Sequence, residues 1–278
     1  RALASRGRTE FDAGAGTDDV NRQRLSTLSL ESRNQLSTSW RSLLRLARGA
    51  DHIRTEGAFP GFFDTDQDQF TWQNDVAALG GQWVAGLEWR REKVASDTAF
   101  TQTTRRFNGV FAGYTARFGD HLLEASARRD DDSQFGAHGT GKLAWGVKVT
   151  PQWRASASVG TAFKAPSFND LYYPLSFGFS GNPDLKPERA RSTELALRHD
   201  GGSLQGGLTV FDSRVKDLIA VDPSFTTVIN VNRARIRGAT LDAAWRADVW
   251  TLRGEFTHQD AEDADTGKRQ SKSSMSWV

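Results

Sequence analysis

Apolar and polar residues alternate with a period of two along most of the chain, and this alternation restricts its fold more than any other feature. The clearest stretch begins at Trp153. One set of its positions holds Trp153, Ala155, Ala157, Val159, Thr161 and Phe163, and the other holds Arg154, Ser156, Ser158, Gly160 and Ala162. Successive side chains of a strand point to opposite faces, so the pattern predicts strands with one apolar and one polar face. No apolar run approaches the ~18 residues that a membrane-spanning helix needs.

Short turns and longer polar segments join the predicted strands in alternation. The short turns lie near residues 37–39, 80–81, 119–120, 151–152, 201–202 and 248, and the longer segments cover 1–21, 49–68, 96–103, 130–139, 164–187, 222–226 and 259–269. Such asymmetry is typical of transmembrane β-barrels, which have tight periplasmic turns and long extracellular loops. We therefore predict an all-β chain, an incomplete antiparallel barrel of about 13 or 14 strands that forms one partial barrel domain over residues 1–278.

A soluble β-sandwich that serves as a binding module is the alternative fold class. Nine Trp and 26 Gly suit either fold, so composition does not separate them. The regular alternation of connection lengths favours the barrel. Aromatic residues near the turns favour it too, because an interfacial girdle would lie there; these are Trp83, Phe118, Trp153 and Trp250. Solubility without detergent would indicate the sandwich.

Charge and motif content speak against catalysis and against nucleic-acid binding. The chain has 36 Lys and Arg against 34 Asp and Glu, which gives no strong basic field. It has no cysteine, which excludes disulfides and thiolate sites. The five histidines are scattered without metal-ligand spacing. The segment Gly136–Lys142 approaches a phosphate-binding loop, but Leu143 stands where Ser or Thr is required. We predict that the protein is not an enzyme.

Two blocks in the middle of the chain carry a family resemblance. They read GTAFKAPSFNDLYYP from Gly160 and GNPDLKPERARSTEL from Gly181. Together they closely resemble a signature of TonB-dependent outer-membrane receptors, and within that family they are most similar to the cobalamin (vitamin B12) transporters. The resemblance covers most of the chain and is weakest before about Leu25.

The resemblance implies a receptor in the bacterial outer membrane that binds a large, scarce nutrient for TonB-energised uptake. Cobalamin is the first expectation, and a ferric siderophore or haem is the alternative. Membrane lipid and the TonB complex would be its partners, the latter through a plug region. The chain starts at Arg1 without a plug-like segment and stops at Val278 inside a predicted strand. Since plugged barrels have about 22 strands, we expect a fragment.

Two groups of residues are candidates for binding. Aromatic and apolar side chains in the loop over 164–187 either contact the ligand or pack within their own loop; they are Phe168, Leu171, Tyr172 and Tyr173, with Phe177 and Phe179 nearby. Acidic residues fall in predicted loops, where carboxylates suit calcium; they are Asp12, Asp18, Asp19, Asp51 and Asp64. The resemblance implies calcium in extracellular loops, and solvated acids are the alternative. We expect no other cofactor.

Overall fold

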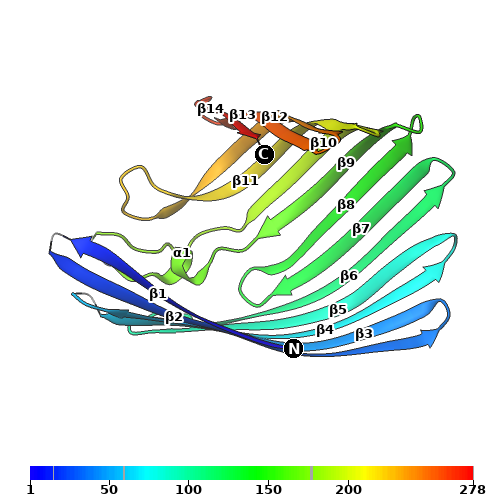
Figure 1. Cartoon of the computed structure of the whole chain (residues 1–278). Helices are drawn as coiled ribbons and strands as arrows, with labels where there is room; N and C mark the ends of the chain where they lie inside the picture. Colours follow the sequence, from blue (N-terminus) through cyan, green and yellow to red (C-terminus); the bar gives the residue numbers. More distant parts are fainter. Residues whose placement is uncertain (15, 59, 176–177, 278) are drawn as a thin grey trace.

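The structure is a computed structural model that describes residues 1–14, 16–58, 60–175 and 178–277. Within these residues the strands form a 14-stranded antiparallel sheet in which each strand pairs with its neighbours in the chain (Figure 1). The strands are β1 (Ala2–Gly14), β2 (Thr17–Ser37), β3 (Trp40–Glu56), β4 (Gly61–Ala78), β5 (Gly81–Ser96), β6 (Thr104–Phe118), β7 (His121–Asp132), β8 (Gly136–Lys148), β9 (Trp153–Lys164), β10 (Glu188–Gly201), β11 (Leu204–Val221), β12 (Val228–Ala247), β13 (Trp250–Asp263) and β14 (Arg269–Trp277). The predicted meander is confirmed.

The sheet curves into a trough with β1 and β14 at its two edges (Figure 1). The short helix α1 (Phe168–Tyr172) lies on the concave side, in the segment between β9 and β10. No helix among the described residues is long and apolar enough to cross a membrane.

Strand β1 was not predicted, and several other strands extend well beyond the predicted ones. Residues 1–21 and 49–68 were expected to be loops, and that expectation is wrong: β1 and β2 occupy most of the first range, and only residues 57–60 separate β3 from β4. The predicted loops over 130–139 and 259–269 shrink in the same way. Polar residues occupy most positions on both faces of these segments, so period-two alternation does not reveal them. Their ladders hold polar pairs such as His52 with Asp64.

The two faces of the sheet differ as the alternation predicts. Leu143, Trp145 and Val147 lie directly opposite Val159, Ala157 and Ala155, so the two sets share one face. Ala157 also lies opposite Leu195, which is 53% exposed. The helix α1 contacts Arg105, which occupies the other face of its strand. The apolar face is therefore the convex one, and it is the face that lipid would cover.

Aromatic side chains form a girdle on the convex face, at the end of the sheet where the tight turns lie. Trp83, Phe118, Trp153 and Trp250 were predicted there, and all are at least 37% exposed next to a turn. Trp40 and Trp245 join them. Amphipathic rings favour the boundary between hydrocarbon and water, so these residues mark one edge of the membrane.

The assigned faces can be tested at two neighbouring residues of β9. Ala157→Arg, on the convex face, should destabilise the whole protein in lipid by about 2–4 kcal/mol, because it places a cation in hydrocarbon. Ser158→Arg is the matched control, since Ser158 lies on the concave face opposite Glu194. Folding titrations into lipid vesicles measure both values. Equal costs would contradict the assignment.

Candidate functional site

The segment between β9 and β10 folds into the trough, beginning with α1 (Figure 1). Ser167 is the N-cap of α1. Its hydroxyl accepts the backbone N–H of Asp170 at 3.1 Å, and the Asp170 carboxylate accepts the N–H of Ser167 at 2.8 Å. This reciprocal pair is a capping box, which satisfies the free donors at the start of a helix. The Ser-Phe-Asn-Asp sequence therefore positions α1 directly after β9.

A small apolar core holds this segment together. Leu171, Leu185 and Val228 are 1%, 3% and 5% exposed and pack against one another. The partly buried side chains around them are Phe135, Tyr172, Phe179 and Ile219. These residues come from the β9–β10 segment, the β7–β8 turn, β11 and β12. The segment is thus packed against its neighbours, and its apolar residues serve its own folding.

Arg105 of β6 attaches the start of the segment to the concave wall. Its guanidinium donates a hydrogen bond to the Pro166 carbonyl at 2.7 Å and lies 4.9 Å from the ring centre of Phe168. Glu92 lies 3.3 Å away and balances the charge. The Arg105 side chain is only 6% exposed, so the ion pair and the aromatic contact are largely shielded from water. Sequence reasoning missed this role of Arg105 because its partners are far along the chain.

Tyr172 links α1 to two neighbouring connections of the sheet. Its hydroxyl donates to the side-chain oxygen of Gln102 at 2.8 Å and accepts from the side-chain nitrogen of Gln134 at 2.5 Å. Gln102 precedes β6, and Gln134 lies in the turn after β7. The Tyr172 hydroxyl therefore acts as a structural link on this side of the trough.

Residues of the second signature block are also structural. A Cβ on Gly181 would lie 2.7 Å from the backbone nitrogen of Tyr173, so only glycine fits this close approach. The Asn182 side chain donates to the Val228 carbonyl at 3.0 Å. Asn230 of β12 bonds to both the N–H and the carbonyl of Lys186, at 2.8 and 2.9 Å. The block thus fastens the segment to β12.

The structure separates the four candidate ligand-binding residues. Phe168 and Leu171 are 7% and 1% exposed, and Tyr172 makes the bonds described above. Tyr173 is 36% exposed and packs against Phe179, with ring centres 6.0 Å apart. It lines a cavity of about 450 Å³ with Asn169, Asp170, Phe179, Ile219, Ala220, Val221 and Val228. Phe177 lies outside the described residues. Ligand contact stays a prediction, and Tyr173 is the most accessible of the four.

A second cavity, of about 470 Å³, opens on the wall of the trough over β5 to β10. Its polar lining includes Ser126, Arg128, Thr140, Lys142, Thr161 and Ser192. Arg128 pairs with Asp130 at 2.6 Å and with Glu88 at 3.3 Å, and Lys142 pairs with Glu124 at 3.1 Å. The concave wall therefore offers hydrogen-bonding and charged groups, as the inside of a transmembrane barrel does.

The five candidate calcium ligands do not converge. Asp19 and Asp51 lie on the concave face, whereas Asp12, Asp18 and Asp64 lie on the convex face, so one ion cannot reach all five. Asp64 pairs with Arg54 and His52, and Asp51 accepts a bond from Gln23. In the described part of the chain, no group of three or more His, Asp or Glu side chains is placed to hold a metal.

Asp19 is the one candidate among the five that is buried. It is 1% exposed, and its Oδ1 accepts the N–H of Ala58 at 2.6 Å. Its Oδ2 is buried without a hydrogen-bond partner among the described residues. A buried carboxylate oxygen without a partner is costly. Calcium at this point stays a prediction, now centred on Asp19.

Removing the Asn230 side chain should loosen the β9–β10 segment. Its side-chain nitrogen also donates to the Asp217 carbonyl at 2.8 Å. Asp217 has no partner residue in the register between β11 and β12. Asn230→Ala should lower the local stability by about 1–3 kcal/mol, because it leaves these backbone groups without partners. Amide hydrogen exchange of residues 178–187 would measure the change. Asn169→Ala is the control, since the Asn169 side chain makes no hydrogen bond among the described residues; equal effects would contradict the prediction.

The turn between β11 and β12 should weaken at low pH. The N–H of Thr227, with smaller contributions from Ser224 and Thr226, holds the pKa of Asp222 well below its usual value of 3.8. The folded pKa lies below the unfolded one, so this stabilisation is complete above about pH 5 and is lost as the pH falls. The turn contacts the β9–β10 segment, because the N–H of Ser180 donates to the Thr226 carbonyl at 3.0 Å.

Asp222→Asn tests this pH dependence. In the unmodified protein, exchange of the Ser180 and Thr226 amides should accelerate, after correction for intrinsic rates, as the pH falls from about 5 to 2. The variant should show faster exchange throughout and little pH dependence. A variant with the same pH profile as the unmodified protein would show that Asp222 is not the responsible group.

Comparisons with known proteins agree with this architecture. The family described as "TonB dependent receptor-like, beta-barrel" matches residues 2–276. A relative named vitamin B12 transporter BtuB, from Photobacterium profundum, is 33% identical over 229 residues, which is 77% of this chain and 36% of the relative. The chain thus spans about a third of that relative's length.

Solved structures show the same fold. The siderophore receptor PirA from Pseudomonas aeruginosa superposes with a TM-score of 0.74 at 14% identity, over 100% of this chain and 62% of that one. A mutant of the ferric enterobactin receptor PfeA from Pseudomonas aeruginosa, solved with enterobactin, gives 0.76 at 17% identity, over 99% and 55%. These findings exclude the β-sandwich alternative. The chain belongs to the TonB-dependent receptor β-barrel family, which is a family of bacterial outer-membrane receptors and transporters rather than of enzymes.

Proposed function

We propose that the whole protein to which this chain belongs binds cobalamin at the outer side of the membrane and imports it. The observation that supports this proposal is the 33% identity, over 77% of the chain, with a relative named as a vitamin B12 transporter. The siderophore receptors resemble this chain at 14% and 17% identity, a level that speaks for the fold and not for the cargo. A ferric siderophore or haem is therefore the alternative cargo to be tested.

The geometry is compatible with a large amphipathic chelate. Tyr173 and Phe179 offer apolar surface at one cavity, and Arg128 and Lys142 offer charge at the other. Recognition would need no chemical step. Work for uptake would come from the TonB complex, acting through a plug region in the whole protein. Calcium bound at Asp19 would stiffen the outer ends of β2 and β3, and calorimetric titration of Asp19→Asn would test that part.

Labelled cobalamin distinguishes the candidate cargoes directly. Cells that produce the whole protein at a normal surface level should bind labelled cobalamin, and excess unlabelled cobalamin should compete. Ferric enterobactin and haem should not compete. Binding of either of these instead of cobalamin would overturn the proposed cargo while leaving the receptor class intact.

Tyr173→Ala should weaken cobalamin binding without affecting assembly. Full burial of a Tyr side chain contributes roughly 1.5–3 kcal/mol of free energy. A ligand would bury only the exposed part of Tyr173, so losing this contact should weaken binding about tenfold. Leu175→Ala is the matched control, because Leu175 is 77% exposed in the same segment and does not line the cavity.

The double variant Tyr172→Ala with Tyr173→Ala should lose more affinity. It also removes the hydroxyl that bonds to Gln102 and Gln134, and so releases α1. Unchanged affinity in both variants would show that these tyrosines have only a structural role.

A further inference from the structure

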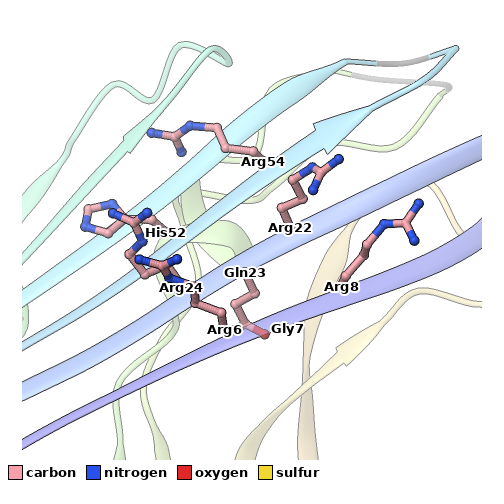
Figure 2. A pocket seen from close by; sticks show the side chains of 8 residues that line it. All are labelled: Arg6, Gly7, Arg8, Arg22, Gln23, Arg24, His52 and Arg54. Atoms are coloured by element: carbon pink, nitrogen blue, oxygen red, sulfur yellow. The ribbon is translucent and has the colours of Figure 1, made fainter.

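One cavity lies outside the trough, and five of its eight lining residues are arginines. Its volume is about 660 Å³, and it spans β1, β2 and β3. Figure 2 shows its lining, which consists of Arg6, Gly7, Arg8, Arg22, Gln23, Arg24, His52 and Arg54. We refer to the five arginines and His52 as the arginine patch. It takes no part in the proposed binding of cobalamin.

The arginine patch forms two rows across the three strands. In one row Arg6 lies opposite Arg24, and Arg24 lies opposite His52. In the other row Arg8 lies opposite Arg22, and Arg22 lies opposite Arg54. All six are at even positions, as are Leu28, Leu30, Leu44 and Leu46, so the patch shares the convex, lipid-facing side. Like charges directly opposite each other destabilise a sheet unless something neutralises them.

Carboxylates within the protein neutralise only part of the patch. Arg8 pairs with Glu10 at 2.6 Å, Arg22 pairs with Glu56 at 2.9 Å, and Asp64 pairs with both Arg54 and His52. Five arginines against three carboxylates leave a surplus of two positive charges. Neither Arg6 nor Arg24 has an ion-pair partner among the residues that the structure describes, and they lie opposite each other. The surplus is thus concentrated in one row.

The height of the patch matches a lipid head group. On the tight-turn side of the patch, the nearest large apolar residues on the outward face of β2 are Leu28 and Leu30, which are 63% and 72% exposed. Arg24 lies four residues before Leu28, which is about 13 Å along the strand. For a strand tilted by roughly 40°, this separation is about 10 Å along the membrane normal. The head-group layer extends roughly 5–8 Å beyond the hydrocarbon, and a long side chain can bridge the difference.

The chemistry of the patch selects phosphate. Guanidinium groups bind phosphate oxygens through paired hydrogen bonds, and a phosphate monoester carries up to two negative charges, which matches the surplus. The patch lies at the membrane end away from the aromatic girdle at the tight turns, which is the outer side. We propose that the arginine patch binds the phosphorylated head group of an outer-leaflet lipid between Arg6 and Arg24, with its acyl chains against Ala2, Ala4 and Leu28.

Lipid retention by the intact receptor tests this proposal. The purified whole protein is incorporated into phosphatidylcholine nanodiscs that contain diphosphoryl lipid A or its dephosphorylated form, and bound lipid is quantified by native mass spectrometry. The phosphorylated form should be retained at least tenfold more strongly. Arg6→Gln with Arg24→Gln should abolish this preference. Equal retention of the two forms, or an unchanged preference in the double variant, would overturn the proposal.

Controls separate lipid binding from charge and from folding. Arg117→Gln with Arg154→Gln removes the same charge at the tight-turn end and should leave the preference unchanged. Arg6→Lys with Arg24→Lys keeps the charge but loses the paired hydrogen bonds, and it should retain an intermediate preference even if the Gln variant misfolds. Inorganic phosphate at millimolar concentration should not displace the lipid; full displacement would identify a soluble-anion site and overturn the lipid assignment. Since none of these readouts involves cobalamin, failure here is independent of the proposed cargo.

Discussion

Pairing of the backbone between chain neighbours is the interaction on which the whole structure depends. Hydrocarbon offers no hydrogen-bond partners, so a spanning strand must satisfy its N–H and C=O groups through the strands beside it. The 14-stranded meander does this with antiparallel ladders and tight turns. Once the ladder is fixed, the side chains have only two faces to occupy, and lipid selects the apolar one. The position of every site described above follows from that division.

The concave face shows how such a wall holds an irregular segment. The β9–β10 segment has few strand-type bonds of its own, so side chains satisfy its backbone: Arg105 at Pro166, Asn182 at Val228 and Asn230 at Lys186. Much of the family signature is thus explained by folding, without any ligand. Its capping box, its Gly181 and its Asn182 are needed to build the segment. The surface that the segment presents is left to fewer residues, chiefly Tyr173 and Phe179.

The two faces of the sheet carry charged residues in different places, because water contacts one face and lipid covers part of the other. Concave charges such as Arg128 and Lys142 have carboxylate partners close by. Convex charges begin where the apolar residues of β2 to β4 end, with Arg48 near Asp66 and Asp68. Farther along the strands the positive charge exceeds the negative in the arginine patch. Arginines aligned across three strands repel one another, so this arrangement favours a surface that binds an anion.

The sequence alone determined the order of strands and turns from β2 onward, the two faces of the sheet and the family. These properties depend on local alternation and on contiguous motifs, which a single chain displays directly. It failed at β1 and at the outer ends of β2 to β4, because polar residues occupy most positions on both faces there and leave no clear period of two.

Only the tertiary structure decided which candidate residues meet. Phe168 and Leu171 are buried by Arg105 and Leu185, and Asp19 is separated from Asp64 by the sheet itself. Arg6 and Arg24 are 18 positions apart in the sequence and become direct neighbours only through the register of β1 and β2. The register of a sheet is set by hydrogen bonds between segments that are distant in the sequence. Local sequence patterns do not show which residues those bonds place opposite each other.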